Sequence, residues 1–139
     1  MFEKILCAND GSERAERALA MALTIAKANG SELHMVCVEE IDYMPLFIEE
    51  VREETGTAAR RFHKVLQRAR ALAEDKGIQL GIHVLAGHAV RDIVGLTGGL
   101  KADLLVIGAT GHSPFYGRML GSRADRLVHL APCPVLVVR

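Results

Sequence analysis

One glycine-rich segment has the composition of a phosphate-binding loop. Gly108 and Gly111 are followed, after nine intervening residues, by Gly121 and Ser122. Glycine lets the main chain approach a bulky anion because no side chain stands in the way. A helical pattern begins at Gly121, and the free N–H groups at a helix N-terminus favour phosphate. The segment therefore indicates a phosphate site, to which Ser122 and Arg123 would contribute, unless its glycines only shape turns.

A second candidate is the polar turn Ala8-Asn9-Asp10-Gly11-Ser12, which follows the first apolar run. Asp10 has the side chain to orient a ribose hydroxyl or to help hold a phosphate-bound Mg²⁺. Its alternative role is that of an acid in the turn before the first helix, where aspartate is common. We favour the ligand role because the glycine-rich segment would face this turn. Ser12 is a candidate helix N-cap.

The other chemistry-bearing residues form no recognisable catalytic or metal-binding set. His112 lies in the glycine-rich segment and could act as a general acid or a phosphate donor, but we interpret it as an exposed loop residue. Ser12 and Ser122 have neither a nucleophile elbow nor a recognisable base. The remaining histidines lack metal-ligand spacing; they are His34, His63, His83, His88 and His129. We therefore predict no catalytic residue and no metal held by protein side chains.

Composition and charge exclude several classes of protein. The chain has 139 residues, 50% of them hydrophobic, which suffices for one compact domain. The 17 Lys and Arg balance 17 Asp and Glu, so a dedicated nucleic-acid or anionic-membrane binder is not expected. Cys7, Cys37 and Cys133 lie in apolar segments and are predicted to be reduced, buried core residues. Since no leader pattern and no apolar stretch of about 20 residues is present, we expect a cytoplasmic protein.

Strand-like and helical patterns alternate along the chain. Apolar runs predict strands at residues 5–8, 33–38, 79–85, 104–107 and 135–138. Apolar residues at helical spacing predict one helix that ends at Gly30 and a second that ends at Gly77. The apolar face of the second helix comprises Ala58, Phe62, Val65, Ala69 and Leu72. Two shorter helices are expected at 89–97, where Gly98 and Gly99 would break the helix, and at 121–130.

The alternation predicts an α/β fold, a single doubly wound five-stranded parallel sheet with helices on both faces. Ligands of such sheets bind beyond the carboxyl ends of the strands, where the winding direction reverses. The polar turn and the glycine-rich segment both follow predicted strands, so we expect them to share one site. The acidic segment from Glu39 to Thr57 is interpreted as a partly helical excursion, which is either a solvated face or a mobile lid or partner surface.

The spacing of the glycines resembles that of the universal stress proteins. ATP-binding members carry glycine, two residues, glycine, nine residues, and then glycine followed by Ser or Thr. Gly108, Gly111 and Gly121-Ser122 fit this spacing. Three further segments are similar to the family's first strand and acidic turn, fourth strand and closing strand; they are residues 7–12, 102–108 and 131–138. The resemblance covers essentially the whole chain and is loose between residues 39 and 58.

The resemblance implies a single domain over residues 1–139, with a Rossmann-like sheet of order 3-2-1-4-5 of the adenine-nucleotide α-hydrolase type. It implies ATP, AMP or ADP as the ligand, with Mg²⁺ or Mn²⁺ bound through the phosphates. It also implies a homodimer formed through the last strand, because the apolar edge segment Val135–Val138 would benefit from being paired.

The same resemblance assigns site residues. Asp10 would contact the ribose, with Ala8 and Asn9 lining that wall. The adenine would face main chain near two strand ends, at Val36, Val38 and Ile107. The phosphates would be held by Gly108, Thr110, Gly111, Gly121, Ser122 and Arg123.

Two positions depart from the family pattern. Arg123 stands where a small or β-branched residue is more common, and it would either strengthen phosphate binding or crowd the pocket. Asn9 stands where an apolar residue is common. Either departure would change which nucleotide fits.

The leading hypothesis is an ATP-binding, dimeric regulator in stress response, which acts on an unknown protein partner and hydrolyses ATP slowly at most. One alternative is a dimeric interaction module of the same family that binds no nucleotide. A true enzyme of a related adenine-nucleotide superfamily would need catalytic segments that longer chains usually supply.

Overall fold

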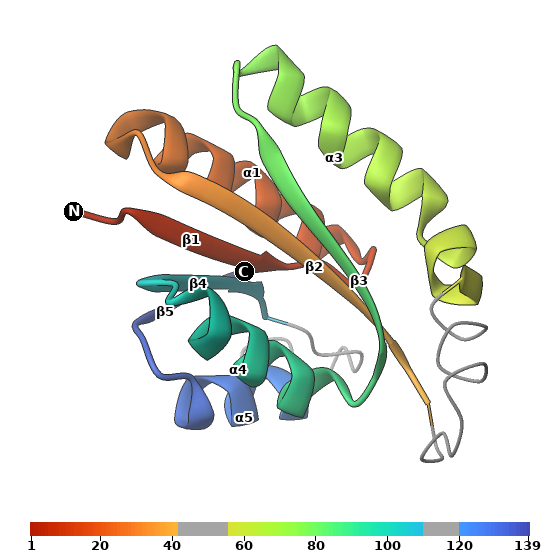
Figure 1. Ribbon diagram of the computed structural model, residues 1–139. Helices are drawn as coiled ribbons and strands as arrows, with labels where there is room; N and C mark the ends of the chain where they lie inside the picture. Colours follow the sequence, from red (N-terminus) through yellow and green to blue (C-terminus); the bar gives the residue numbers. More distant parts are fainter. Residues whose placement is uncertain (42–55, 110–119) are drawn as a thin grey trace.

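The five predicted strands form one parallel sheet of order β3-β2-β1-β4-β5, as expected (Figure 1). The computed structural model describes residues 1–41, 56–109 and 120–139. The strands are β1 (Lys4–Ala8), β2 (Glu32–Glu40), β3 (Leu80–Gly87), β4 (Leu104–Gly108) and β5 (Val135–Val138). The helices are α1 (Glu13–Asn29), α3 (His63–Asp75), α4 (Ala89–Leu100) and α5 (Ser122–Leu130).

Helices cover both faces of the sheet, because successive strand residues point to opposite sides. Ile5 and Cys7 of β1 pack with α1 and α3 in one buried cluster. Leu6, between them, packs with α4 and α5 in a second cluster. Figure 1 shows α1 and α3 on one side of the sheet, above it in this view, and α4 and α5 on the other side, below it. No helix in residues 1–41, 56–109 or 120–139 combines the length and apolarity needed to cross a membrane.

Helix α1 follows its sequence signals. The Ser12 hydroxyl accepts a hydrogen bond from the N–H of Ala15 at 3.2 Å, which confirms the predicted N-cap. The apolar stripe of this helix is buried as predicted, at Ala15, Leu19, Ala22, Leu23 and Ala26. Gly30 ends the helix at φ 64°, a left-handed conformation that glycine adopts without strain.

Two predicted boundaries were wrong. Strand β2 continues through Glu39 and Glu40, because both residues pair with the end of β3. The predicted excursion therefore begins later, and residues 42–55 lie outside the described part of the chain. Helix α4 does not break at Gly98 and Gly99 but ends after Leu100. Packing of the apolar face of α4 on the sheet outweighs the low helix propensity of glycine, which is a difference of only about 1 kcal/mol per residue.

Two predictions of burial also need correction. Leu72 of α3 is 38% exposed, so the apolar face of that helix is narrower than predicted. Cys133 is only partly buried, whereas Cys7 and Cys37 are buried as expected. Burial raises the pKa of the Cys37 thiol to about 12, with a contribution from the carboxylates of Asp10 and Glu16. The core thiols therefore stay protonated and unreactive at neutral pH.

Candidate functional site

A pocket opens beyond the carboxyl ends of β1, β2 and β4, between the sheet and helices α4 and α5. The empty space within it is about 500 Å³, which includes open solvent at its mouth. The lining is mostly apolar, and polar side chains come from Asn9, Asp10 and Arg123. The sheet order places the pocket beside the point between β1 and β4 where the winding reverses.

Most of the predicted site residues come together here. The pocket is lined by Ala8, Asn9, Asp10, Val36, Val38, Ile107, Gly108 and Arg123. Gly121 and Ser122 stand at the beginning of α5, just before Arg123, and are not part of this lining. Thr110 and Gly111 lie outside the described residues.

Sequence reasoning missed the helical part of the wall, which consists of Ala15, Ala89, Ile93, Ala124 and Leu127. These residues have the apolar helical spacing of ordinary core positions. Only their place beyond the end of the sheet makes them pocket residues, and the periodic pattern does not reveal that place.

Asn9 holds the first turn in shape. Its Oδ1 accepts a hydrogen bond from the N–H of Gly11 at 2.9 Å, and its Nδ2 lies 3.6 Å from the sulfur of Met35. Its main-chain N–H donates to the carbonyl of Val36 at 2.9 Å. Asn9 is 2% exposed. An apolar side chain could not make the two side-chain contacts, which gives a structural reason for asparagine at this position.

Asp10 is partly committed to the same turn. Its Oδ1 accepts a hydrogen bond from the N–H of Ser12 at 2.9 Å, which is the turn role considered as the alternative to ligand binding. No hydrogen bond to its Oδ2 is made within residues 1–41, 56–109 and 120–139. The exposed carboxylate therefore shapes the turn with one oxygen and offers the other to the pocket.

Gly108 is required by packing as well as by its place in the glycine pattern. A Cβ atom on Gly108 would lie 2.8 Å from the carbonyl carbon of Arg14 and 2.9 Å from the nitrogen of Ala15. The Arg14 guanidinium also donates a hydrogen bond to the carbonyl of Ala109. The first glycine of the segment thus lets the end of β4 contact the first turn of α1, whether or not an anion is present.

The helix N-termini at this end of the sheet differ in how they are capped. Ser12 caps α1. The main-chain N–H of Ala89 at the start of α4 donates to Glu40 Oε1 at 2.8 Å, and that of His88 donates to Asp92 Oδ2 at 3.0 Å. At α5, no side chain of the described residues caps Gly121. Within the described residues, no side chain therefore occupies the main-chain donors at the start of α5, which is the arrangement that suits an anion.

An ion pair stands at the rim of the pocket. Arg123 Nη2 lies 3.6 Å from Glu40 Oε1, and His88 Nδ1 lies 3.9 Å from Glu40 Oε2. Glu40, the last residue of β2, thereby connects the start of α4 with the first turn of α5. Sequence reasoning placed Glu40 in the acidic excursion, and a contact between residues so far apart in the chain leaves no local signal. The cation at Arg123 is thus partly compensated before any ligand binds.

Proteins of one family are similar to this chain over its whole length. Residues 1–139 match the family model described as "Universal stress protein family". A universal stress protein of Thermus aquaticus is 38% identical over 143 residues, with all of both chains covered. Universal stress protein YxiE of Bacillus subtilis is 32% identical over 151 residues, again with all of both chains covered.

Solved structures agree with this assignment. Universal stress protein UspA from Lactobacillus plantarum superposes with a TM-score of 0.80 and 27% identity, covering 99% of this chain and 97% of its own. A universal stress protein in complex with cAMP superposes at 0.78 with 24% identity, over 99% and 97%. The Archaeoglobus fulgidus protein in complex with dAMP superposes at 0.65 with 22% identity, over 100% and 98%. The last two support the fold. The chain belongs to the universal stress protein family.

Proposed function

We propose that this chain binds an adenine nucleotide, ATP or its AMP and ADP relatives, in the pocket beyond β1, β2 and β4. The observation that carries the proposal is an apolar pocket with Asp10 Oδ2 on one side and the N-terminus of α5 on the other. Among the described residues, no group donates to that oxygen and no side chain caps that helix. An apolar cleft with a few convergent polar groups is the usual form of a small-molecule site.

The residues present suit the parts of a nucleotide. Apolar walls from Val36, Val38 and Leu127 suit a flat base, and Asp10 Oδ2 is an acceptor for ribose hydroxyls. Main-chain N–H groups after Gly121, together with Arg123, suit phosphates. The glycine spacing, which includes Thr110 and Gly111, supports the same assignment. Family members solved with cAMP and dAMP lend further support.

A divalent ion would arrive with the nucleotide. No group of three or more potential metal ligands exists among residues 1–41, 56–109 and 120–139. Mg²⁺ or Mn²⁺ would therefore be held chiefly by phosphate oxygens, as Mg²⁺ commonly is in nucleotide sites. With no general base assigned at the pocket, we expect slow hydrolysis at most.

The role in the cell that follows is a nucleotide-responsive regulator in stress response, cytoplasmic and homodimeric. Among the described strands, β5 pairs with β4 alone and stands at the edge of the sheet, with its four apolar residues half-buried. A second β5 would cover that edge. Nucleotide binding at the other side of β4 would then bias which of two dimer surfaces meets a protein partner.

The decisive experiment measures melting temperature against ATP concentration, with and without Mg²⁺. At a ligand concentration 100 times Kd, the stabilisation should be about 2.7 kcal/mol. Arg123→Ala should weaken binding about tenfold or more, because a hydrogen bond to a charged group is worth about 1.5–3 kcal/mol. The matched control is Arg126→Ala, on the exposed side of the same helix, which should leave binding unchanged. Absence of any nucleotide-dependent shift would refute the proposal.

Two observations favour the interaction module that binds no nucleotide. Arg123 already has a carboxylate partner in Glu40, and Gly108 has a packing role that needs no ligand. This alternative predicts a dimer purified without absorbance from bound nucleotide and with a melting temperature that ATP, ADP and AMP all leave unchanged.

A further inference from the structure

Two histidines that are distant in sequence meet on the sheet face that also forms the pocket wall. Strands β2 and β3 are parallel, with His34 opposite Gly81 and Val36 opposite His83. The two histidines are therefore offset by two residues and share a face. His34 Nδ1 lies 2.9 Å from His83 Nε2. The sequence shows no metal-ligand spacing at these positions, since the parallel register alone brings them together.

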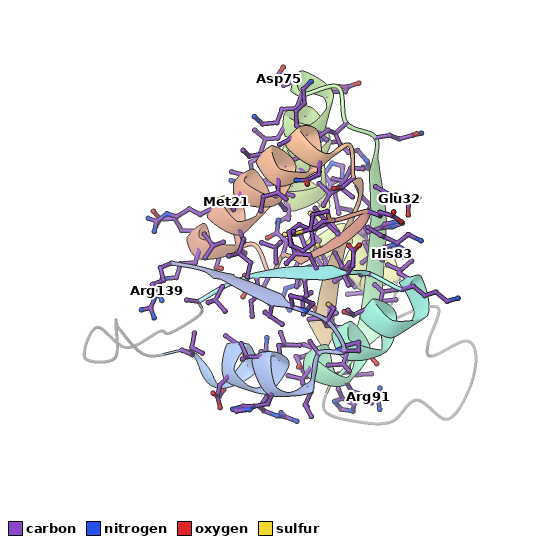
Figure 2. The ribbon with its side chains drawn as sticks, turned by 90° about the vertical axis from the view of Figure 1, so that its left-hand side faces the viewer. Met21, Glu32, Asp75, His83, Arg91 and Arg139 are labelled. Atoms are coloured by element: carbon purple, nitrogen blue, oxygen red, sulfur yellow. The ribbon has the colours of Figure 1, made fainter. Side chains whose placement is uncertain are left out.

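A carboxylate orients the first ring. Glu32 Oε2 lies 2.8 Å from His34 Nε2, and Lys4 Nζ lies 3.4 Å from the same oxygen. A carboxylate only accepts at neutral pH, so His34 Nε2 carries the proton. His34 Nδ1 is then the ring atom that faces His83. Figure 2 shows Glu32 and His83 on the same side of the sheet.

The protonation states suit metal ligation. Hydrogen bonds from His34 and Lys4 lower the pKa of Glu32, which keeps that group ionised. Partial burial, with the neighbouring His34, lowers the pKa of His83, which keeps its ring neutral. Metal ions require neutral imidazoles.

The backbone also leaves room beside the ring. A Cβ on Gly81 would lie 2.6 Å from His34 Nδ1 and 2.9 Å from His34 Cε1. Any side chain at residue 81 would therefore displace the ring from its position. In Figure 1, the first halves of β2 and β3 have no described helix in front of them, and Glu32 is 57% exposed. The His34 side chain is 16% exposed and His83 is also partly exposed, so solvent ions can reach the pair.

We infer that His34 Nδ1 and His83 Nε2 bind one divalent transition ion, with Glu32 as the carboxylate that orients His34. Zn–N bonds of 2.0–2.1 Å in tetrahedral geometry place two nitrogens about 3.4 Å apart, so the rings need to separate by only roughly half an ångström. His83 shifts its proton from Nε2 to Nδ1, so that the ring stays neutral and the ion takes the place of the hydrogen that joined the two rings. A ligating histidine that donates its other N–H to a carboxylate is the usual arrangement in metal sites.

The chemistry of the ligands selects the ion. Imidazole suits Zn²⁺, Cu²⁺ and Ni²⁺, whereas Mg²⁺ and Ca²⁺ prefer oxygen ligands. No set of three or more protein ligands occurs in the described part of the chain, so water completes the coordination. This site lies apart from the lining of the nucleotide pocket, and its test needs no nucleotide.

The test is a titration of the full chain with Zn²⁺ alone, followed by calorimetry and by NMR of the imidazole nitrogens. We expect one saturable site, with shifts at His34 Nδ1 and His83 Nε2. His34→Gln and His83→Gln should each abolish it, and Glu32→Gln should weaken it about tenfold or more. His129→Gln, which removes an exposed histidine paired with Asp125, is the matched control and should bind normally.

A second variant tests the geometry of the site without removing either histidine. Gly81→Ala keeps both imidazoles but moves His34, and it should lose the site. Affinity should also fall between pH 7.5 and pH 5.5, because protons compete for the same nitrogens. The inference is overturned if no saturable site is seen, if the NMR shifts fall on other histidines, or if a folded His83→Gln variant binds as tightly as the parent.

Discussion

The two ends of β2 present the same face of the sheet to very different surroundings. Toward its carboxyl end, Val36 and Val38 face α4 and α5 and form an apolar wall. Toward its amino end, Glu32 and His34 lie where no described helix covers this face (Figure 1), and they belong to a hydrogen-bonded chain that reaches His83. Residues on one face of one strand thus change from polar to apolar where the helices begin.

A part of a parallel sheet that no helix covers can hold charged and imidazole side chains on its strands. Parallel strands are usually apolar because helices cover both faces. Here the covered end encloses a pocket whose charges stand at the rim. The uncovered end has its charges and rings on the strands themselves. The pocket therefore depends on helix packing, whereas the histidine pair depends on strand register.

The largest expected effect is a loss of stability at Gly108, where the shape of the pocket depends on backbone packing. Gly108→Val would place a branched side chain against the main chain of Arg14 and Ala15. Overpacking typically costs about 1–3 kcal/mol, and more where rigid backbone must move. We expect a loss of about 3 kcal/mol or more in the free energy of unfolding, measured with urea.

Gly98→Ala is the matched control for that substitution. A Cβ at Gly98 meets nothing within 4 Å, and the residue lies inside α4. Alanine there should stabilise the protein by roughly 0.5–1 kcal/mol. Equal destabilisation by the two substitutions would contradict the assignment of Gly108 as a close-packing position.

Gly121→Val separates ligand binding from packing. Gly121 has φ −64° and ψ 158°, a conformation open to any residue, so the fold should persist. A branched side chain at the start of α5 would obstruct the main-chain donors proposed for phosphate. ATP affinity, measured by calorimetry, should fall tenfold or more, with little change in the melting temperature of the free protein. Unchanged ATP binding would make the assignment of this segment wrong.

The sequence was sufficient for the fold and for the residues adjacent to recognisable turns. Apolar runs predicted all five strands, and Asp10 and Arg123, which line the pocket, could be named as candidates because each lies in a segment with its own pattern. Glu40 was missed because its strand pairing and its contact with Arg123 are both long-range. His34 and His83 were missed for the same reason. Local periodicity reports which face of an element is apolar, but not which residues of distant elements meet.

Glu40→Gln tests whether the Glu40–Arg123 ion pair at the pocket rim weakens nucleotide binding. Removing the carboxylate frees Arg123 for phosphate while an amide oxygen can still accept from Ala89. Because exposed ion pairs are worth about 1 kcal/mol or less, ATP should bind a few-fold more tightly, and adenosine should be unaffected. Glu39→Gln is the control, since Glu39 pairs with Arg61 rather than with Arg123. If nucleotide binds but Glu40→Gln changes no affinity, the ion pair does not regulate the pocket.

The smallest expected effect is on the pH dependence of stability. It concerns the histidine pair near the amino end of β2, which no described helix covers on this face. Because the pKa of His83 is lowered from its ordinary value of 6.5, the folded state disfavours protonation of this ring. Its contribution to stability is therefore present above about pH 6.5 and is lost as the pH falls below that value. The ring faces His34, which in turn contacts Glu32, and it is partly exposed, so screening limits the change to roughly 0.5 kcal/mol or less. Urea unfolding at pH 7.5 and pH 5.5 should show a smaller loss of stability for His83→Gln than for the parent, whereas His129→Gln should match the parent. An identical pH dependence in all three proteins would mean that the strand register brings the two rings together without coupling their protonation to folding.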